Sequence, residues 1–281
     1  MDCLELDDQQ IGVGPTKELS LRASVATLVR VMFNDLVDGN RMVALERTAT
    51  LREIQGKTEA TVIAKPFGGA VRLINPQQLI RLIGNFHFDS ERSRQEGDFR
   101  ILINPASWAM VREICRENLK KNEYGILNSN PERELFEEFE DTLNIRLTRD
   151  QYQLKPRGII VEGQPIKTDS VRAAGLLTAR IYYIFDAWVD TPELVKRMVA
   201  NSEQYSDADL QKIAWDDAQR GGRGRANAIL TLELDALTEM YRSMPMDERS
   251  EPIRYEEHGL AGNVLAILQE VDQSRYKRLM V

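Results

Sequence analysis

Three Asn-Pro pairs constrain the fold of this chain more than any other feature of its sequence. They are Asn75-Pro76, Asn104-Pro105 and Asn130-Pro131, and a stretch with helical periodicity follows each pair. Asparagine caps a helix by accepting a hydrogen bond from a first-turn amide, and proline suits the first helical position. The pairs therefore predict helices that begin at residues 76, 105 and 131. Polar residues 87–98 are expected to form an exposed loop.

Strand-like runs are interleaved with these helices. Residues 157–163 and 176–189 are rich in β-branched and aromatic side chains, and residues 58–73 read as a strand that breaks at Gly68-Gly69. Residues 23–33 fit a helix or a strand equally well. Further helices are expected at 191–201, 226–241 and 260–271, while 202–219 gives no clear prediction. The pattern indicates a mixed α and β fold.

Composition narrows the function classes. The 281 residues carry a formal charge of -7, which argues against broad binding to nucleic acid. No apolar run approaches the roughly 18 residues of a membrane span, and the acidic N-terminus does not resemble a signal peptide. The two cysteines, Cys3 and Cys115, form no zinc-ligand or disulfide pattern, and we expect Cys115 to be a buried apolar residue. We expect a cytoplasmic protein without a membrane partner.

The helix predicted at residues 131–143 concentrates negative charge. Five carboxylates and one arginine lie between Arg133 and Asp141. Helical spacing places an apolar stripe, Leu135, Phe136, Phe139 and Leu143, on one face and Glu134, Glu137, Glu138 and Asp141 on the other. The set contains no lysine, so its like charges repel at i, i+3 and i+4. Either the face is simply solvated, or it holds a cation such as Mg²⁺ through carboxylates, water and substrate phosphate.

The core of this stretch, "RELFEE" at Arg133–Glu138, resembles the Nudix box, in which arginine and glutamates lie on one helix. The order of segments is also similar to the Nudix hydrolase superfamily: two strands around "NDLVDGNR", a strand leading to Gly68 and Gly69, and the back half from "LLTARIYYIFDA". This resemblance implies an α/β/α sandwich with a mixed sheet. It further implies an N-terminal arm at 1–22 and a domain at 23–245 that carries a helical insertion at about 74–128. A C-terminal helical extension would occupy 246–281.

The resemblance also implies an activity. Glu134, Glu137 and Glu138 would bind Mg²⁺ or Mn²⁺, and Arg133 would orient them. Arg223, Arg225, Gly68 and Gly69 would bind a nucleotide-type ligand. The chain would then hydrolyse a phosphoanhydride bond in a nucleotide-derived substrate, and a homodimer is common in that family.

The sequence departs from the full motif on both sides of its core, and downstream Glu140 and Asp141 replace a glycine and an aliphatic residue. The family's upstream glutamate and glycine are replaced by Gly125 and Leu119, and residues 70–129 replace a short loop. The alternative function is therefore a catalytically degenerate module that senses a nucleotide. A late carboxylate, Asp216 or Asp217, is a further candidate ligand by resemblance. "RGGRGR" at 220–225 suits a phosphate clamp or a plain surface loop.

Overall fold

A computed structural model gives the structure of residues 11–54, 56–120, 125–167, 175–245, 252–268 and 270–279. Over these ranges the chain is a mixed α/β protein with eight α-helices. Its main sheet has 14 strands, contains parallel and antiparallel pairs, and does not close on itself; a second sheet has two strands. The mixed α and β class predicted from the sequence is confirmed.

The strands of the first half are β1 (Ile11–Val13), β2 (Leu21–Asn34), β3 (Arg41–Ile54), β4 (Lys57–Lys65), β5 (Phe67–Ala70), β6 (Arg72–Leu73), β7 (Phe86–Phe88), β8 (Arg100–Ile103) and β9 (Leu127–Asn128). Those of the second half are β10 (Tyr152–Glu162), β11 (Ile166–Lys167), β12 (Leu177–Val189), β13 (Arg225–Glu233), β14 (Ile253–Tyr255), β15 (His258–Leu260) and β16 (Tyr276–Arg278).

The helices are α1 (Pro76–Ile83), α2 (Glu91–Glu96), α3 (Trp108–Asn118), α4 (Pro131–Leu143), α5 (Pro192–Gln204), α6 (Asp207–Gln219), α7 (Leu234–Ser243) and α8 (Val264–Ile267), with short 3-10 turns at Pro105–Ser107 and Arg149–Gln151. All three Asn-Pro predictions are confirmed. The side chains of Asn75, Asn104 and Asn130 each accept a hydrogen bond from a backbone amide of the following turn.

Strand β2 holds the sheet together because both of its edges are paired over most of its length. One edge pairs in parallel with β12, from Leu21 opposite Leu177 to Met32 opposite Trp188. The other edge is shared in succession by β8, β5 and β3, all antiparallel. The segment 23–33, which fitted either helix or strand, is thus a central strand.

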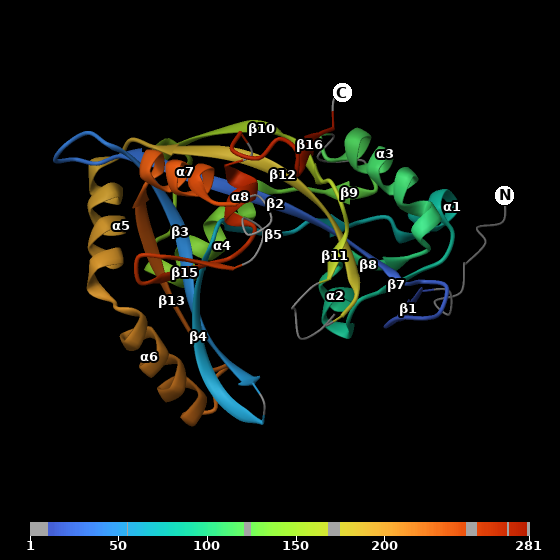
Figure 1. Cartoon of the computed structure of the whole chain (residues 1–281), viewed down its shortest axis with the longest axis horizontal. Helices are drawn as coiled ribbons and strands as arrows, with labels where there is room; N and C mark the ends of the chain where they lie inside the picture. Colours follow the sequence, from blue (N-terminus) through green and yellow to red (C-terminus); the bar gives the residue numbers. More distant parts are fainter. Residues whose placement is uncertain are drawn as a thin grey trace.

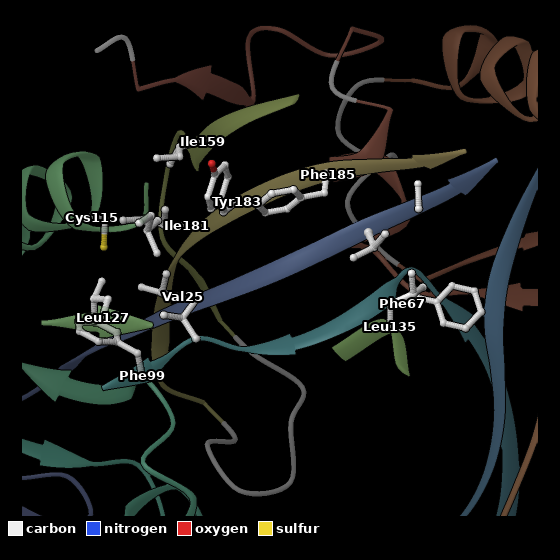
Figure 2. Close-up of a cluster of buried hydrophobic side chains, with 14 of the residues drawn as sticks. Val25, Phe67, Phe99, Cys115, Leu127, Leu135, Ile159, Ile181, Tyr183 and Phe185 are labelled. Atoms are coloured by element: carbon white, nitrogen blue, oxygen red, sulfur yellow. The ribbon is translucent and has the colours of Figure 1, made fainter. Parts of the chain in front are cut away.

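The apolar core lies on two faces of β2. Val25, Val29 and Val31 belong to a cluster that includes side chains of α1, α3, α4 and α5, whereas Leu28 belongs to a second cluster with α7 and α8. Successive strand residues point to opposite faces, so one strand can supply both clusters. Figure 1 shows α5 and α6 alongside β13, β3 and β4, with α1 and α3 at the other end of the sheet. Figure 2 shows part of the first cluster, with Val25 and Ile181 at the left of the view and Phe67 with Leu135 at the right.

Two predicted segments have a different structure. The expected helix at 226–241 begins as strand β13 and becomes helix α7 only at Leu234. Strand β13 pairs with β3 over nine residues, so sheet hydrogen bonds override the local helical spacing. The expected loop at 87–98 instead contains most of strand β7 and helix α2. Its Asp89 is buried in an ion pair with Arg22.

The ends and the insertion also differ from expectation. The expected helical insertion contains β7 and β8, and β8 pairs with β2 in the main sheet. The C-terminal extension is mainly strands: β15 pairs with β4, β16 pairs with β10, and the expected closing helix is only α8. The first ten residues of the predicted arm lie outside the described residues, while Ile11–Val13 pairs with β7.

The glycine pair lies within strand β5, so the strand break is not at the glycines but at Pro66, between β4 and β5. Gly68 has a φ of 138°, and a Cβ there would clash with the backbone oxygen of Thr27 on β2. Only glycine allows this backbone conformation at such close approach. The pair therefore lets β5 lie directly against β2.

We predict that Gly68→Ala lowers the free energy of unfolding by roughly 3 kcal/mol, because backbone strain of about 1–3 kcal/mol adds to the clash with β2. Gly39→Ala is the matched control, since Gly39 also has a positive φ, 76°, but no atom lies within 4 Å of its added Cβ. Urea unfolding would measure both. Equal losses in the two variants would show that the contact with Thr27 carries no cost.

Candidate functional site

The candidate site lies where β3 changes partner. Strand β3 pairs with β2 over Arg41–Ala44 and with β4 from Glu46 onward. Glu46 and Lys65 lie directly opposite each other at the first pair of the β3–β4 ladder. Strand β5 begins two residues later and crosses to β2. A buried carboxylate and a lysine thus lie at the point where the two ladders separate.

Helix α4 packs against this point through its apolar face. Leu135 and Phe139 are buried, and the Phe139 ring lies 5.0 Å from the ring of Phe67 on β5. Asn130 caps the helix by accepting the amide of Arg133 at 2.9 Å, and the helix ends at Asn144 in the left-handed conformation. Leu135 and Phe139 confirm the predicted apolar stripe; the side chain of Leu143 lies outside the described part of the structure.

Two of the helix carboxylates turn inward rather than to water. Glu138 Oε2 accepts a hydrogen bond from the backbone N–H of Gly68 at 2.7 Å. Glu134 lies against Gly69, where a Cβ would clash with its carboxylate. Their side chains are 16% and 11% exposed, whereas that of Glu137 is 58% exposed. A simply solvated acidic face is therefore wrong for Glu134 and Glu138, although it describes Glu137, Glu140 and Asp141.

Cations of the chain itself neutralise these carboxylates. Arg133 forms ion pairs with Glu134 and, at 3.3 Å, with Glu137. Lys65 Nζ lies 2.6 Å from Glu46 Oε2 and 3.5 Å from Glu138 Oε1. Arg133 thereby contacts two of the three glutamates of "RELFEE".

The pKa values of the two carboxylates beside Lys65 are displaced in opposite directions. Burial opposes ionisation of Glu46, but the ammonium of Lys65 outweighs it and lowers the pKa of Glu46 to about 2. For Glu138, burial and the nearby charge of Glu46 raise the pKa well above its usual value. Burial also raises the pKa of Glu134, partly offset by Arg133. Displaced carboxylates of this kind are characteristic of functional sites, although structural ion pairs produce them too.

Of the two candidate arginines, one adjoins the acidic cluster and the other does not. Arg225, at the start of β13, donates to Glu46 Oε1 at 2.7 Å and therefore adjoins the site. Arg223 is exposed, and no contact links it to the acidic cluster in the described structure. Asp217 accepts the amide of Gly224 at 2.9 Å, so this carboxylate organises the "RGGRGR" loop.

Glu46 and Lys65 are not among the site residues predicted from the sequence. Glu46 is 1% exposed, and its Oε2 accepts no hydrogen bond of good geometry despite the ion pair with Lys65. The signal was present, because a glutamate and an arginine directly follow the apolar residues "MVAL", which is unusual for a central strand. Which residues would surround it depended on the pairing of β3 with β4.

The carboxylates do not converge as a closed metal cage. Across the ranges given above, no three side chains of His, Cys, Asp or Glu form a group able to hold a metal ion. Mg²⁺, however, commonly uses one or two carboxylates and takes its other ligands from water and phosphate. The buried Oε2 of Glu46 and the inward carboxylates of Glu134 and Glu138 are hard oxygen donors of the kind that Mg²⁺ prefers. The donor set therefore fits Mg²⁺ or Mn²⁺ bound together with a phosphate ligand.

A pocket of about 720 Å³ lies elsewhere, beside α7, and its lining includes Trp188 and four arginines. Each arginine lies within ion-pair distance of a carboxylate: Arg30 and Arg157 with Asp186, Arg41 with Asp235, and Arg242 with Glu239. Because its charges are balanced locally, this pocket is a weaker candidate for an anionic ligand.

No protein-family model matches the chain, and no curated protein sequence matches it. Among the described helices, none is long and apolar enough to span a membrane.

We predict opposite effects on stability for the two carboxylates beside Lys65. Glu46→Gln should lower the free energy of unfolding at pH 7 by roughly 2 kcal/mol or more, because it breaks a buried ion pair. Glu138→Gln should raise it by about 1 kcal/mol, because the ionised form of Glu138 is disfavoured in the fold. Urea unfolding at several pH values would measure both.

The two effects should vanish over different pH ranges. The folded pKa of Glu46 is depressed, so its contribution is complete above about 4.5 and is lost as the pH falls toward 2. The folded pKa of Glu138 is raised, so its penalty disappears once the pH falls below 4.5. A stability loss in Glu138→Gln at pH 7 would contradict this assignment.

Proposed function

We propose that this chain is a Nudix-like hydrolase domain that cleaves a phosphoanhydride bond in a nucleotide-derived substrate. The order of elements supports the proposal: strands β2 to β5, the helix α4, strands β10 and β12, two helices, strand β13 and helix α7. Apolar clusters on both faces of the sheet agree with an α/β/α sandwich. Residues 74–128 would be an insertion before α4.

The observation that carries the proposal is the contact between "RELFEE" and the glycine pair. Glu138 accepts the amide of Gly68, and Glu134 occupies the space beside Gly69. Two parts of the sequence linked only by resemblance are thus neighbours in space. Since glycine lacks a side chain, the carboxylates of α4 can lie directly against the backbone of β5.

Different residues of the chain would bind the metal, position its ligands and bind the substrate phosphate. Glu134, Glu137 and Glu138 would hold Mg²⁺ or Mn²⁺, with Arg133 fixing Glu134 and Glu137 in position. Such a cation polarises a phosphoryl oxygen and lowers the pKa of bound water. Arg225 would bind a substrate phosphate through its guanidinium, and exposed Arg223 is a lesser candidate for the same role.

A second candidate function is nucleotide sensing without cleavage. Its support is the ion pair of Lys65 with Glu46 and Glu138, which already neutralises part of the acidic cluster. Gly125, which stands where the family has a further glutamate, contributes no carboxylate. Calorimetry with a panel of nucleotides, with and without Mg²⁺, would separate the two functions. Tight binding without product would favour the sensor.

We predict that Glu137→Gln and Glu138→Gln each abolish metal-dependent release of phosphate or nucleoside monophosphate. Each substitution removes a negative charge from the proposed metal ligands while preserving side-chain size. Glu140→Gln is the matched control, because Glu140 is exposed on the same helix and outside the proposed site. Product release would be followed by chromatography.

Unchanged turnover in both Glu137→Gln and Glu138→Gln would reject the site assignment. Loss of turnover in Glu140→Gln as well would point to a general effect of helix charge rather than to metal ligation.

A further inference from the structure

Lys65 bridges carboxylates from two separate elements. Its ammonium lies 2.6 Å from Glu46 on β3 and 3.5 Å from Glu138 on α4. The lysine is the last residue of β4, and Pro66 separates it from the glycine strand. One monovalent cation of the chain therefore lies between the buried Glu46 and the half-buried Glu138, which contacts the glycine strand.

Each carboxylate keeps a partner when the bridge opens, and Oε2 of Glu46, the buried oxygen that Lys65 contacts, is then left without one. Glu46 keeps the guanidinium of Arg225, which contacts its other oxygen at 2.7 Å, and the hydroxyl of Thr48 at 3.0 Å. Glu138 keeps the amide of Gly68. The side chain of Lys65 is 33% exposed, so its ammonium can reach water by rotation of a flexible four-carbon stem.

A divalent cation and the ammonium cannot share this space. Both would be drawn to Glu46 and Glu138, and they repel each other strongly at such short range. Metal that enters between these carboxylates must therefore displace Lys65 toward solvent. A displaced ammonium beside a bound metal is well placed to bind phosphate as a point charge.

We propose that Lys65 is a built-in counter-ion of Glu46 and Glu138. A divalent cation displaces its ammonium, which then binds the phosphate of the incoming ligand. This inference rests on the proposed function, because it assumes that metal and a diphosphate meet at this site. The inference adds a statement of how the binding of metal and the binding of diphosphate depend on each other. Metal alone competes with Lys65 and binds weakly, whereas metal and diphosphate together satisfy every charge.

Positive coupling between the two ligands follows. By thermodynamic linkage, if the diphosphate raises the affinity of the chain for metal by some factor, the metal raises its affinity for the diphosphate by the same factor. Part of this coupling comes from direct contact between metal and diphosphate. The remainder requires the ammonium of Lys65.

The experiment titrates Mn²⁺ into the full chain and follows free metal by electron paramagnetic resonance. The variants are wild type, Lys65→Met, Lys65→Arg and the control Lys57→Met, which removes an exposed lysine at the far end of the same strand. Each titration is repeated with methylenediphosphonate, a diphosphate analogue that is not hydrolysed, after correction for its binding of Mn²⁺ in solution.

We expect Lys65→Met to bind Mn²⁺ alone about tenfold more tightly than wild type, and the analogue to improve its Mn²⁺ affinity by a smaller factor. Lys65→Arg and Lys57→Met should resemble wild type, because both keep a cation between Glu46 and Glu138. Far-UV circular dichroism would check folding. If Lys65→Met does not fold, Lys65→Gln, which can still donate to Glu46, makes the same comparison.

Unchanged Mn²⁺ affinity in Lys65→Met would overturn the counter-ion role, and so would an absence of Mn²⁺ binding in every variant. Suppose that Lys65→Met binds Mn²⁺ more tightly but the analogue improves its Mn²⁺ affinity as much as it does in wild type. This result would overturn the transfer of Lys65 to phosphate. If the expected Mn²⁺ affinities were found but no nucleotide were hydrolysed, the result would support this inference and reject the hydrolase function. The two proposals can therefore fail separately.

Discussion

The sharing of one edge of β2 among three strands is the constraint on which the rest of the structure depends. Because β12 occupies the other edge, β8, β5 and β3 must divide the remaining edge between them. Strand β3 leaves β2 after Ala44 and continues with β4, and β5 fills the space so created. That branch point brings Glu46, Lys65 and the glycine strand together and gives α4 its packing surface.

The branch point has an electrostatic consequence. Burial there disfavours charge on Glu138 and Glu134, while Lys65 and Arg225 preserve the charge of Glu46. Buried ion pairs rarely stabilise a fold more than apolar residues of similar size would. An arrangement that costs stability at Glu138 agrees with the binding chemistry that we propose for this site. A fold can maintain such a cluster where the surrounding strands and the helix are well packed.

Asn-Pro caps and runs of β-branched residues predicted their elements well, whereas helical spacing alone did not. Helix α4 begins where Asn130-Pro131 predicts it, because a cap and a first turn involve residues within three positions of each other. Residues 226–233 were assigned to a helix, yet they form β13 because β3 offers a continuous edge. Of the proposed site, the residues of "RELFEE" and the glycine pair were found from the sequence. Glu46 and Lys65 were not, since their partners come from different elements.

By itself the sequence determined where α4 begins, which of its residues are apolar and which carboxylates it carries. These properties follow from helical geometry and from contacts within a few residues. Only the tertiary structure decided that Glu134 and Glu138 face the glycine strand while Glu137 faces solvent. The hydrogen bond from Gly68 to Glu138 joins residues 70 positions apart. A carboxylate's partners and pKa depend on such distant strands, and the pairing of those strands is a property of the whole sheet.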